Sequence, residues 1–176
     1  MSANIEVVLI LGQLTDDKTA DISSQVDRAL GRLESVENPE LILVINSGGG
    51  YFSEAFDRLI EKIRSTSVPT IAKIYHASSA ASMIALAAKC REIDKNGAFG
   101  FHNGNVEITG SDLLPDGSLT KRSRASLERM IKLNQELLEQ ASVELPPDMK
   151  VQLAASGRLV LNAQQCIDLG VVSRIA

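Results

Sequence analysis

The strongest constraint on the fold is the alternation of short apolar segments with amphipathic ones in the first half of the chain. Residues 5–11, 41–46 and 68–75 are short and rich in aliphatic and β-branched side chains, as buried strands are. Residues 21–34 and 53–64 place apolar side chains at spacings of three and four, which predicts amphipathic helices. Strands that alternate with helices favour an α/β protein with a parallel sheet.

The middle of the chain predicts a different set of elements. Residues 91–93 and 98–102 favour two short strands around a turn at residues 95–97. The polar residues 103–120 contain glycine and proline and predict a long loop, which in a compact domain is often functional. Residues 121–142 carry an apolar stripe and predict the longest helix.

The C-terminal residues complete the pattern. After Pro146-Pro147 we expect a helix at 148–155, a strand at 158–161, a helix capped reciprocally by Asn162 and Gln165 and ended by Gly170, and a last strand through Val171 and Val172. No sequence repeat interrupts this order. We therefore expect residues 1–176 to form one domain.

The composition is that of a globular protein, and it excludes several classes of function. Hydrophobic residues make up 44% of the chain, so it can bury a core without disulfides. A net charge of -4 and the absence of tryptophan argue against a nucleic-acid partner. Cys90 and Cys166 lack metal-ligand spacing, so we expect no metal site and a reducing compartment. The sequence shows no signal peptide or membrane span, and we expect a cytoplasmic protein without membrane contact.

One strand-to-helix junction is the best candidate for chemistry. The apolar segment 68–75 runs into small residues at 77–81 and then into a helix whose first turn would hold Ser82. N–H groups at the start of a helix stabilise developing negative charge, so a serine there is a candidate nucleophile. Small residues at such a junction also allow a helix to pack closely on a sheet, and this structural interpretation stays open.

A nucleophilic serine needs a base and donors for an oxyanion, and few residues can supply them. The chain has two histidines, His76 and His102, of which His102 ends a predicted strand. Residues 48–50 are three glycines after another predicted strand, where backbone N–H groups can approach a charged group closely. These glycines predict a loop, but it lacks the ending of a phosphate loop and the spacing of a dinucleotide-binding motif. A tight strand-to-helix turn is the alternative interpretation of the three glycines, and it stays open.

Four motifs occur in a characteristic order. They are INSGGG at 45–50, AASM at 80–83, FHNG at 101–104 and LNAQQCIDLGVVSRI at 161–175. Together they resemble the proteolytic subunit of the Clp protease and, more broadly, the ClpP/crotonase superfamily. The resemblance implies an α/β fold of the ClpP/crotonase type, a spiral of strand-strand-helix units. It also implies that residues 121–142 form a protruding handle helix.

The resemblance also implies a function. It makes the chain a serine-type endopeptidase with Ser82 as nucleophile, His102 as general base, and the N–H groups of Gly50 and Met83 as the oxyanion hole. No metal or other cofactor is implied. The implied substrates are peptides or unfolded proteins, and the implied partners are further copies in a homo-oligomeric ring, with stacked rings and an ATP-dependent unfoldase as further possibilities.

The chain departs from the family at several positions. Ser78-Ser79 stand where the family usually has Gly-Gln, and Gly48 replaces a proline. Arg158 stands where the family has the aspartate that orients the histidine. The acids that could substitute are Glu107, Asp112 and Asp116. Because a missing orienting acid lowers activity strongly, a catalytically silent ring or scaffold subunit is the alternative.

Two further alternatives remain. The segment around Gly157-Arg158 also resembles the signal peptide peptidase A branch, in which a lysine is the base, and Lys121 would be the candidate here. A lysine base must be neutral near pH 7, which requires desolvation, and Lys121 stands next to Arg122 in a polar stretch. The other alternative is acyl-CoA chemistry of the crotonase type, against which the AASM motif argues.

Overall fold

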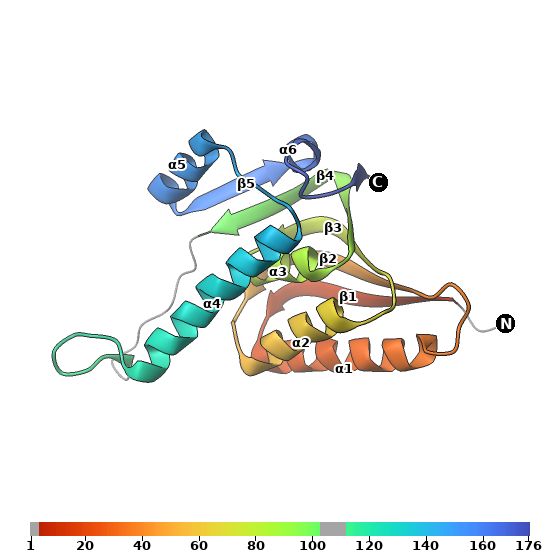
Figure 1. Cartoon of the computed structure of the whole chain (residues 1–176), viewed down its shortest axis with the longest axis horizontal. Helices are drawn as coiled ribbons and strands as arrows, with labels where there is room; N and C mark the ends of the chain where they lie inside the picture. The colour runs from red at the N-terminus through yellow and green to blue at the C-terminus, as the bar shows by residue number, and fades with distance from the viewer. Residues whose placement is uncertain (1–3, 103–111) are drawn as a thin grey trace.

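The computed structural model describes residues 4–102 and 112–176. Within these residues six strands form one sheet, in which β1 to β4 are parallel and follow the order of the sequence (Figure 1). β5 is antiparallel to β4, and the short β6 also pairs with β4. The strands are β1 (Ile5–Leu14), β2 (Glu40–Gly50), β3 (Thr70–Ser78), β4 (Cys90–His102), β5 (Arg158–Asn162) and β6 (Arg174–Ile175).

The helices are α1 (Asp16–Leu33), α2 (Glu54–Ser65), α3 (Ala80–Ala87), α4 (Lys121–Gln140), α5 (Pro147–Ser156) and α6 (Ala163–Asp168). They connect the strands: α1 to α3 cover one face of the sheet formed by β1 to β4, α4 packs on α3, and α5 and α6 lie beside β5 (Figure 1). The predicted long helix is confirmed as α4, and its N-terminal end projects well beyond the other helices in Figure 1. α6 begins with the predicted reciprocal cap between Asn162 and Gln165.

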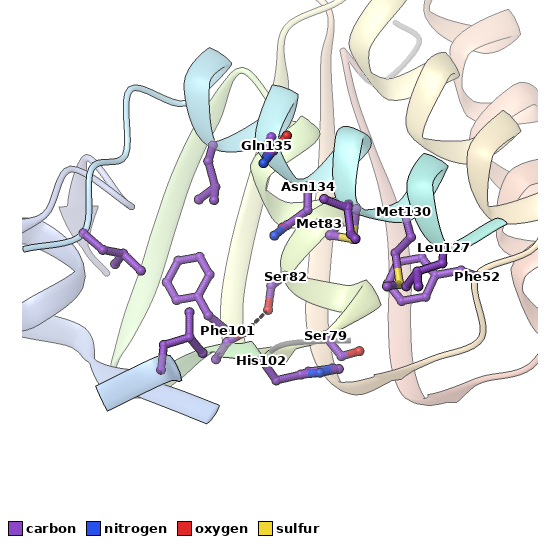
Figure 2. Close-up of a pocket in the computed structure, with 15 residues that line it drawn as sticks. Phe52, Ser79, Ser82, Met83, Phe101, His102, Leu127, Met130, Asn134 and Gln135 are labelled. Atoms are coloured by element: carbon purple, nitrogen blue, oxygen red, sulfur yellow. Dashed lines mark hydrogen bonds between the residues drawn. The ribbon is translucent and has the colours of Figure 1, made fainter. Parts of the chain in front are cut away.

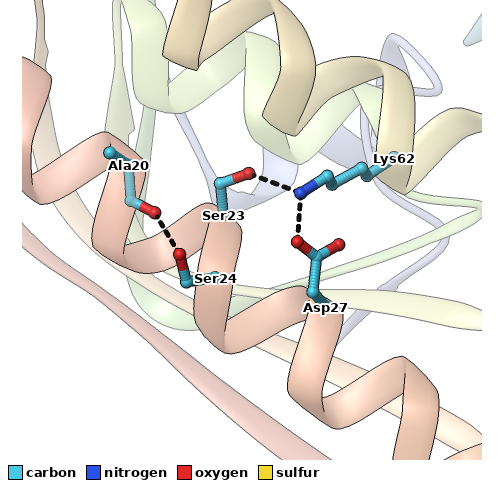
Figure 3. Close-up of polar contacts among 5 residues, drawn as sticks. All are labelled: Ala20, Ser23, Ser24, Asp27 and Lys62. Atoms are coloured by element: carbon cyan, nitrogen blue, oxygen red, sulfur yellow. Dashed lines mark hydrogen bonds and ion pairs between the residues drawn. The ribbon is translucent and has the colours of Figure 1, made fainter.

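Two polar connections fix the first helices. The side chain of Thr15 accepts a hydrogen bond from the N–H of Lys18, and α1 therefore begins several residues before the predicted start. Lys62 of α2 donates to Ser23 Oγ at 3.0 Å and forms an ion pair with Asp27 of α1 (Figure 3). α1 and α2 are thus joined on the same side of the sheet.

The core lies between the sheet and α1 to α3. Phe56 and Leu59 of α2 and Ile10 of β1 are among its fully buried side chains. Cys166 of α6 is also buried, and burial raises the pKa of its thiol to about 12, so the thiol stays protonated at neutral pH. Among the described helices, none is both long and apolar enough to span a membrane.

The opposite face of the sheet carries apolar side chains that the described chain does not cover. Along β1 the burial alternates, with Val8 and Ile10 buried while Val7 and Leu9 are 52% and 51% exposed. Ile5 and Leu11 on the same face are also more than 40% exposed. Parallel sheets usually have both faces covered, so an exposed face of this kind is unusual.

The glycine segment is not a loop, contrary to the sequence prediction. β2 continues through Gly50 because β1 also continues to Leu14 and supplies pairing partners, with Gln13 opposite Gly49 and Leu14 opposite Gly50. The first strand, predicted for residues 5–11, continues through a bulge at Gly12 to Leu14. The three glycines are therefore held by strand pairing.

Two other predictions about the strands were wrong. Residues 91–93 and 98–102 belong to the single strand β4, because the intervening residues form a bulge opposite β3 between the pairs Ile74–Ile93 and His76–Ala98. Val171 and Val172 are buried outside any strand. The last strand is Arg174–Ile175, which pairs with Glu92 and Ile93 of β4.

Candidate active site

The junction between β3 and α3 is a tight turn with a strained backbone. Ser79 precedes α3 with φ 57° and ψ -128°, which a non-glycine residue rarely adopts. Gly49 packs directly against this turn, since a Cβ atom at Gly49 would lie 2.5 Å from the Ser78 carbonyl oxygen and 2.6 Å from the Ser79 Cβ. Ser47 Oγ accepts a hydrogen bond from the Gly49 N–H at 3.1 Å and fixes this approach.

Ser82 lies in the first turn of α3, as predicted. Its side chain is almost completely buried, and its Oγ donates a hydrogen bond to the carbonyl oxygen of Gly100 in β4 at 2.6 Å. A hydroxyl in this position is held by a defined contact between the helix and the neighbouring strand. To transfer its proton to a base, the hydroxyl must turn away from the Gly100 carbonyl.

A cavity of about 410 Å³ opens beside Ser82 (Figure 2). Its other walls are mostly apolar and include Phe52, Met83, Phe101, Leu127, Met130 and Leu138. The apolar stripe predicted for α4 therefore has two roles. Leu137 and Ala141 are buried in the core, whereas Leu127 and Met130 line the cavity. The polar side chains of Asn134 and Gln135 also face this space.

Ion pairs to α2 hold α4 in place beside the cavity. Arg129 of α4 pairs with Asp57 of α2, and Arg64 of α2 pairs with Glu136 of α4 at 3.4 Å. Partial burial raises the pKa of Asp57, and the guanidinium of Arg129 opposes that effect. These pairs join α4 to α2. Phe52, in the loop that precedes α2, also lines the cavity.

His102 is the last residue of β4 and lines the same cavity as Ser82. In Figure 2 its imidazole ring extends toward Ser79, while the Ser82 hydroxyl points to the Gly100 carbonyl. The structure thus brings the two residues expected to act as nucleophile and base to one cavity. Ser79, which the sequence did not single out as functional, lines that cavity too. The turn imposes the unusual backbone conformation of Ser79, and no feature of the sequence indicates it.

Met83 and Gly50, the two residues expected to form the oxyanion hole, have different surroundings. The N–H of Met83 donates to the Ser79 carbonyl oxygen at 3.3 Å, at the long end of the hydrogen-bond range, and the N–H of Ser82 donates to the same oxygen at 3.0 Å. Gly50 lies with His102 on a second, more polar groove. Use of the Met83 N–H for an oxyanion requires replacement of its long bond to Ser79.

The alternative base and acids lie elsewhere. Lys121 is the exposed first residue of α4 and does not line the cavity with Ser82. Asp112 accepts a hydrogen bond from Ser123 Oγ at 2.7 Å, and Asp116 accepts from Ser118, whose hydrogen bonds lower the pKa of this carboxyl. Both acids precede α4 at its projecting end and line neither the cavity nor the groove. Glu107 lies outside the described residues.

Arg158 is the first residue of β5 and stands directly opposite His102 in the antiparallel pair of β4 and β5. Side chains at opposite positions of such a pair lie on the same face of the sheet and close together. The position that the family resemblance assigns to the orienting acid is therefore beside the histidine, and it carries a cation. Among the described residues, no group of three or more potential ligands of a metal ion is present.

Two solved structures share the fold of this chain over nearly its whole length. Neither the protein-family models nor the curated protein sequences compared with this chain give a match. A ClpP1 mutant from Listeria monocytogenes matches with a TM-score of 0.70 and 23% sequence identity, covering 97% of this chain and 90% of that one. A mutant of the membrane-bound stomatin-specific protease 1510-N matches with a TM-score of 0.69 and 18% identity, covering 98% of this chain and 79% of that one.

These matches define the class of fold. The chain has the ClpP-like serine peptidase fold, as the four sequence motifs implied. The two neighbours are ClpP1 and a stomatin-specific protease, and this chain is similar in structure to both over nearly its whole length.

Proposed function

We propose that this protein is a serine-type endopeptidase that cleaves peptide bonds through an acyl-enzyme on Ser82, with His102 as the general base. The observation that carries the proposal is that Ser82 and His102, which come from α3 and the end of β4, line one cavity of about 410 Å³. The fold shared with two proteases supports the same conclusion. The apolar walls of the cavity suit an apolar side chain of the substrate.

The proposed reaction has two stages. In the first, Ser82 Oγ bonds to the scissile carbonyl carbon while His102 takes the hydroxyl proton, and the oxyanion forms near the glycine segment and the start of α3. The C–N bond then breaks, and the leaving amine takes the proton from His102. In the second stage water attacks the acyl-enzyme with His102 again as base, and Ser82 is released with its proton restored.

The alternative is a catalytically silent subunit that serves as a ring or scaffold component. It is favoured by the cation of Arg158 opposite His102, where an orienting acid is expected, and by the hydrogen bond that directs the Ser82 hydroxyl to Gly100. A silent subunit would keep the fold and the cavity but would not activate Ser82.

Labelling with a fluorophosphonate separates these two functions. Such reagents react with serines that a base and an oxyanion hole activate, so we expect one adduct per chain by intact mass on wild type and none on Ser82→Ala. Ser79→Ala is the matched control, because Ser79 lines the same cavity and lies toward His102, and this variant should keep the adduct. Loss of the adduct in Ser79→Ala alone would make Ser79 the nucleophile, and no adduct on wild type would support the silent subunit.

We also propose that the protein assembles into a homo-oligomeric ring in the cytoplasm, where an ATP-dependent unfoldase could supply unfolded substrates. The uncovered apolar face of β1 supports self-association, because exposed apolar patches of this kind mark interaction surfaces. The free thiols of Cys90 and Cys166 suit a reducing compartment.

Leu9→Lys should dissociate this assembly. Leu9 is 51% exposed at the centre of the apolar face, and a lysine there would place a charge in the contact. We expect native mass spectrometry to show an oligomer for wild type and a smaller species for Leu9→Lys. Val151→Lys on α5, where Val151 is also exposed, is the matched control and should remain assembled. A monomeric wild type would contradict the ring.

A further inference from the structure

A second groove lies on the other side of His102. Its volume is about 960 Å³, and it shares Ser79 and His102 with the apolar cavity. Its walls include Gly48, Gly50 and Arg158, so it runs along the glycine segment of β2 to the start of β5. A substrate bound across His102 would therefore meet apolar walls on one side and this groove on the other.

The groove is cationic in the part that the structure describes. Its described lining residues include Arg158 and no aspartate or glutamate, although the whole chain carries a net charge of -4. Lys18 also lies close to the groove: its Nζ would be 3.5 Å from a Cβ atom added at Gly12, which lines the groove. A cationic groove in an acidic protein selects anionic ligands.

The guanidinium of Arg158 is available to a ligand. The backbone of Arg158 bonds to Ser156, but its side chain is exposed and has no hydrogen bond or ion pair with the described residues. A guanidinium presents two parallel N–H donors that match a carboxylate. Because Arg158 pairs with His102 across β4 and β5, a carboxylate bound there lies close to the proposed base.

We infer that Arg158 forms a carboxylate-binding subsite, and that the preferred substrates carry a carboxylate close to the scissile bond. The carboxylate can belong to an acidic side chain or to the free C-terminus of a peptide, since both present the same group to the guanidinium. The role of this subsite in cleavage rests on the proposed peptidase function, whereas the binding of carboxylates by Arg158 does not.

Matched peptides test the inference in turnover. Each peptide has an apolar residue before the scissile bond, and the series compares Glu with Gln after it and a free C-terminus with an amidated one. We expect wild type to favour a carboxylate in kcat/KM by about tenfold or more, as for a charge-assisted hydrogen bond. Arg158→Gln should lose that preference and still cleave the neutral peptide, and Arg158→Lys should keep part of it. The comparison of Glu with Gln tests an acidic side chain as the source of the carboxylate, and the comparison of a free with an amidated C-terminus tests the terminal carboxylate.

Binding to Ser82→Ala keeps the inference testable if the chain proves inactive. The same peptides should bind this variant by calorimetry with a carboxylate preference that disappears when Arg158→Gln is added. Arg28→Gln, an exposed arginine of α1 outside the groove, removes the same charge and should leave the preference unchanged. Equal affinity for carboxylate and neutral peptides, or a preference that survives Arg158→Gln, would overturn the subsite. Arg158-dependent binding without any turnover would instead overturn only the peptidase function.

Discussion

Ser82→Ala is expected to lower kcat for peptide or ester hydrolysis by about a thousandfold or more, because it removes the proposed attacking hydroxyl and the Ser79 hydroxyl of the same cavity lies outside the first turn of α3. His102→Gln should cause a loss of similar size, since the hydroxyl is a weak nucleophile without its base. The double variant should be no slower than the slower single variant. Residues that act as one unit show this lack of additivity.

Steady-state kinetics of the three variants and wild type check this prediction. Thermal unfolding serves as the control for folding, because Ser82 also holds α3 to β4 through Gly100 and its loss removes one buried hydrogen bond. Chemical steps should be affected much more than KM. Independent, additive losses in kcat would show that Ser82 and His102 do not cooperate, and unchanged hydrolysis in Ser82→Ala would remove the proposed mechanism.

Gly50→Ala is expected to destabilise the fold by about 3 kcal/mol or more, the upper range for overpacking a core position. A Cβ at Gly50 would lie 1.9 Å from the carbonyl oxygen of Leu14, and the backbone of the paired strand β1 cannot move aside without breaking the ladder. For a chain of this length the corresponding fall in Tm is about 6 °C or more.

Gly48→Ala is the matched control for that prediction. Gly48 lies two residues earlier on β2, is exposed, and has no atom within 4 Å of an added Cβ. We expect its Tm to stay within a few degrees of wild type in the same thermal melt. Equal melting temperatures for the two variants would show that β1 does not approach β2 closely at Gly50.

Much of the fold follows from local patterns. The apolar strands, the amphipathic helices and the reciprocal cap of α6 depend on residues a few positions apart, and the periodicity of side chains reports them directly. The placement of Ser82 in the first turn of α3 and of His102 at the end of β4 follows in the same way. The ClpP-like fold was predictable because four such motifs occur in one order.

Where local patterns failed, a distant segment decided the structure. The glycines at 48–50 read as a loop because glycine disfavours strands, yet β1 extends beside them and supplies a pairing partner. Likewise, the apolar stripe of α4 carries no local sign of a cavity, but part of it lines one because α4 packs against α3, which carries Ser82.

The order of the elements and the candidate nucleophile and base could be read from the sequence, because they depend on neighbours along the chain and on short motifs. Two relations follow from the folded chain alone: Gly49 packs against the strained turn at Ser79, and Arg158 stands opposite His102. Those relations join residues that are far apart in sequence, and strand pairing and close packing of the backbone create them only when the sheet is complete.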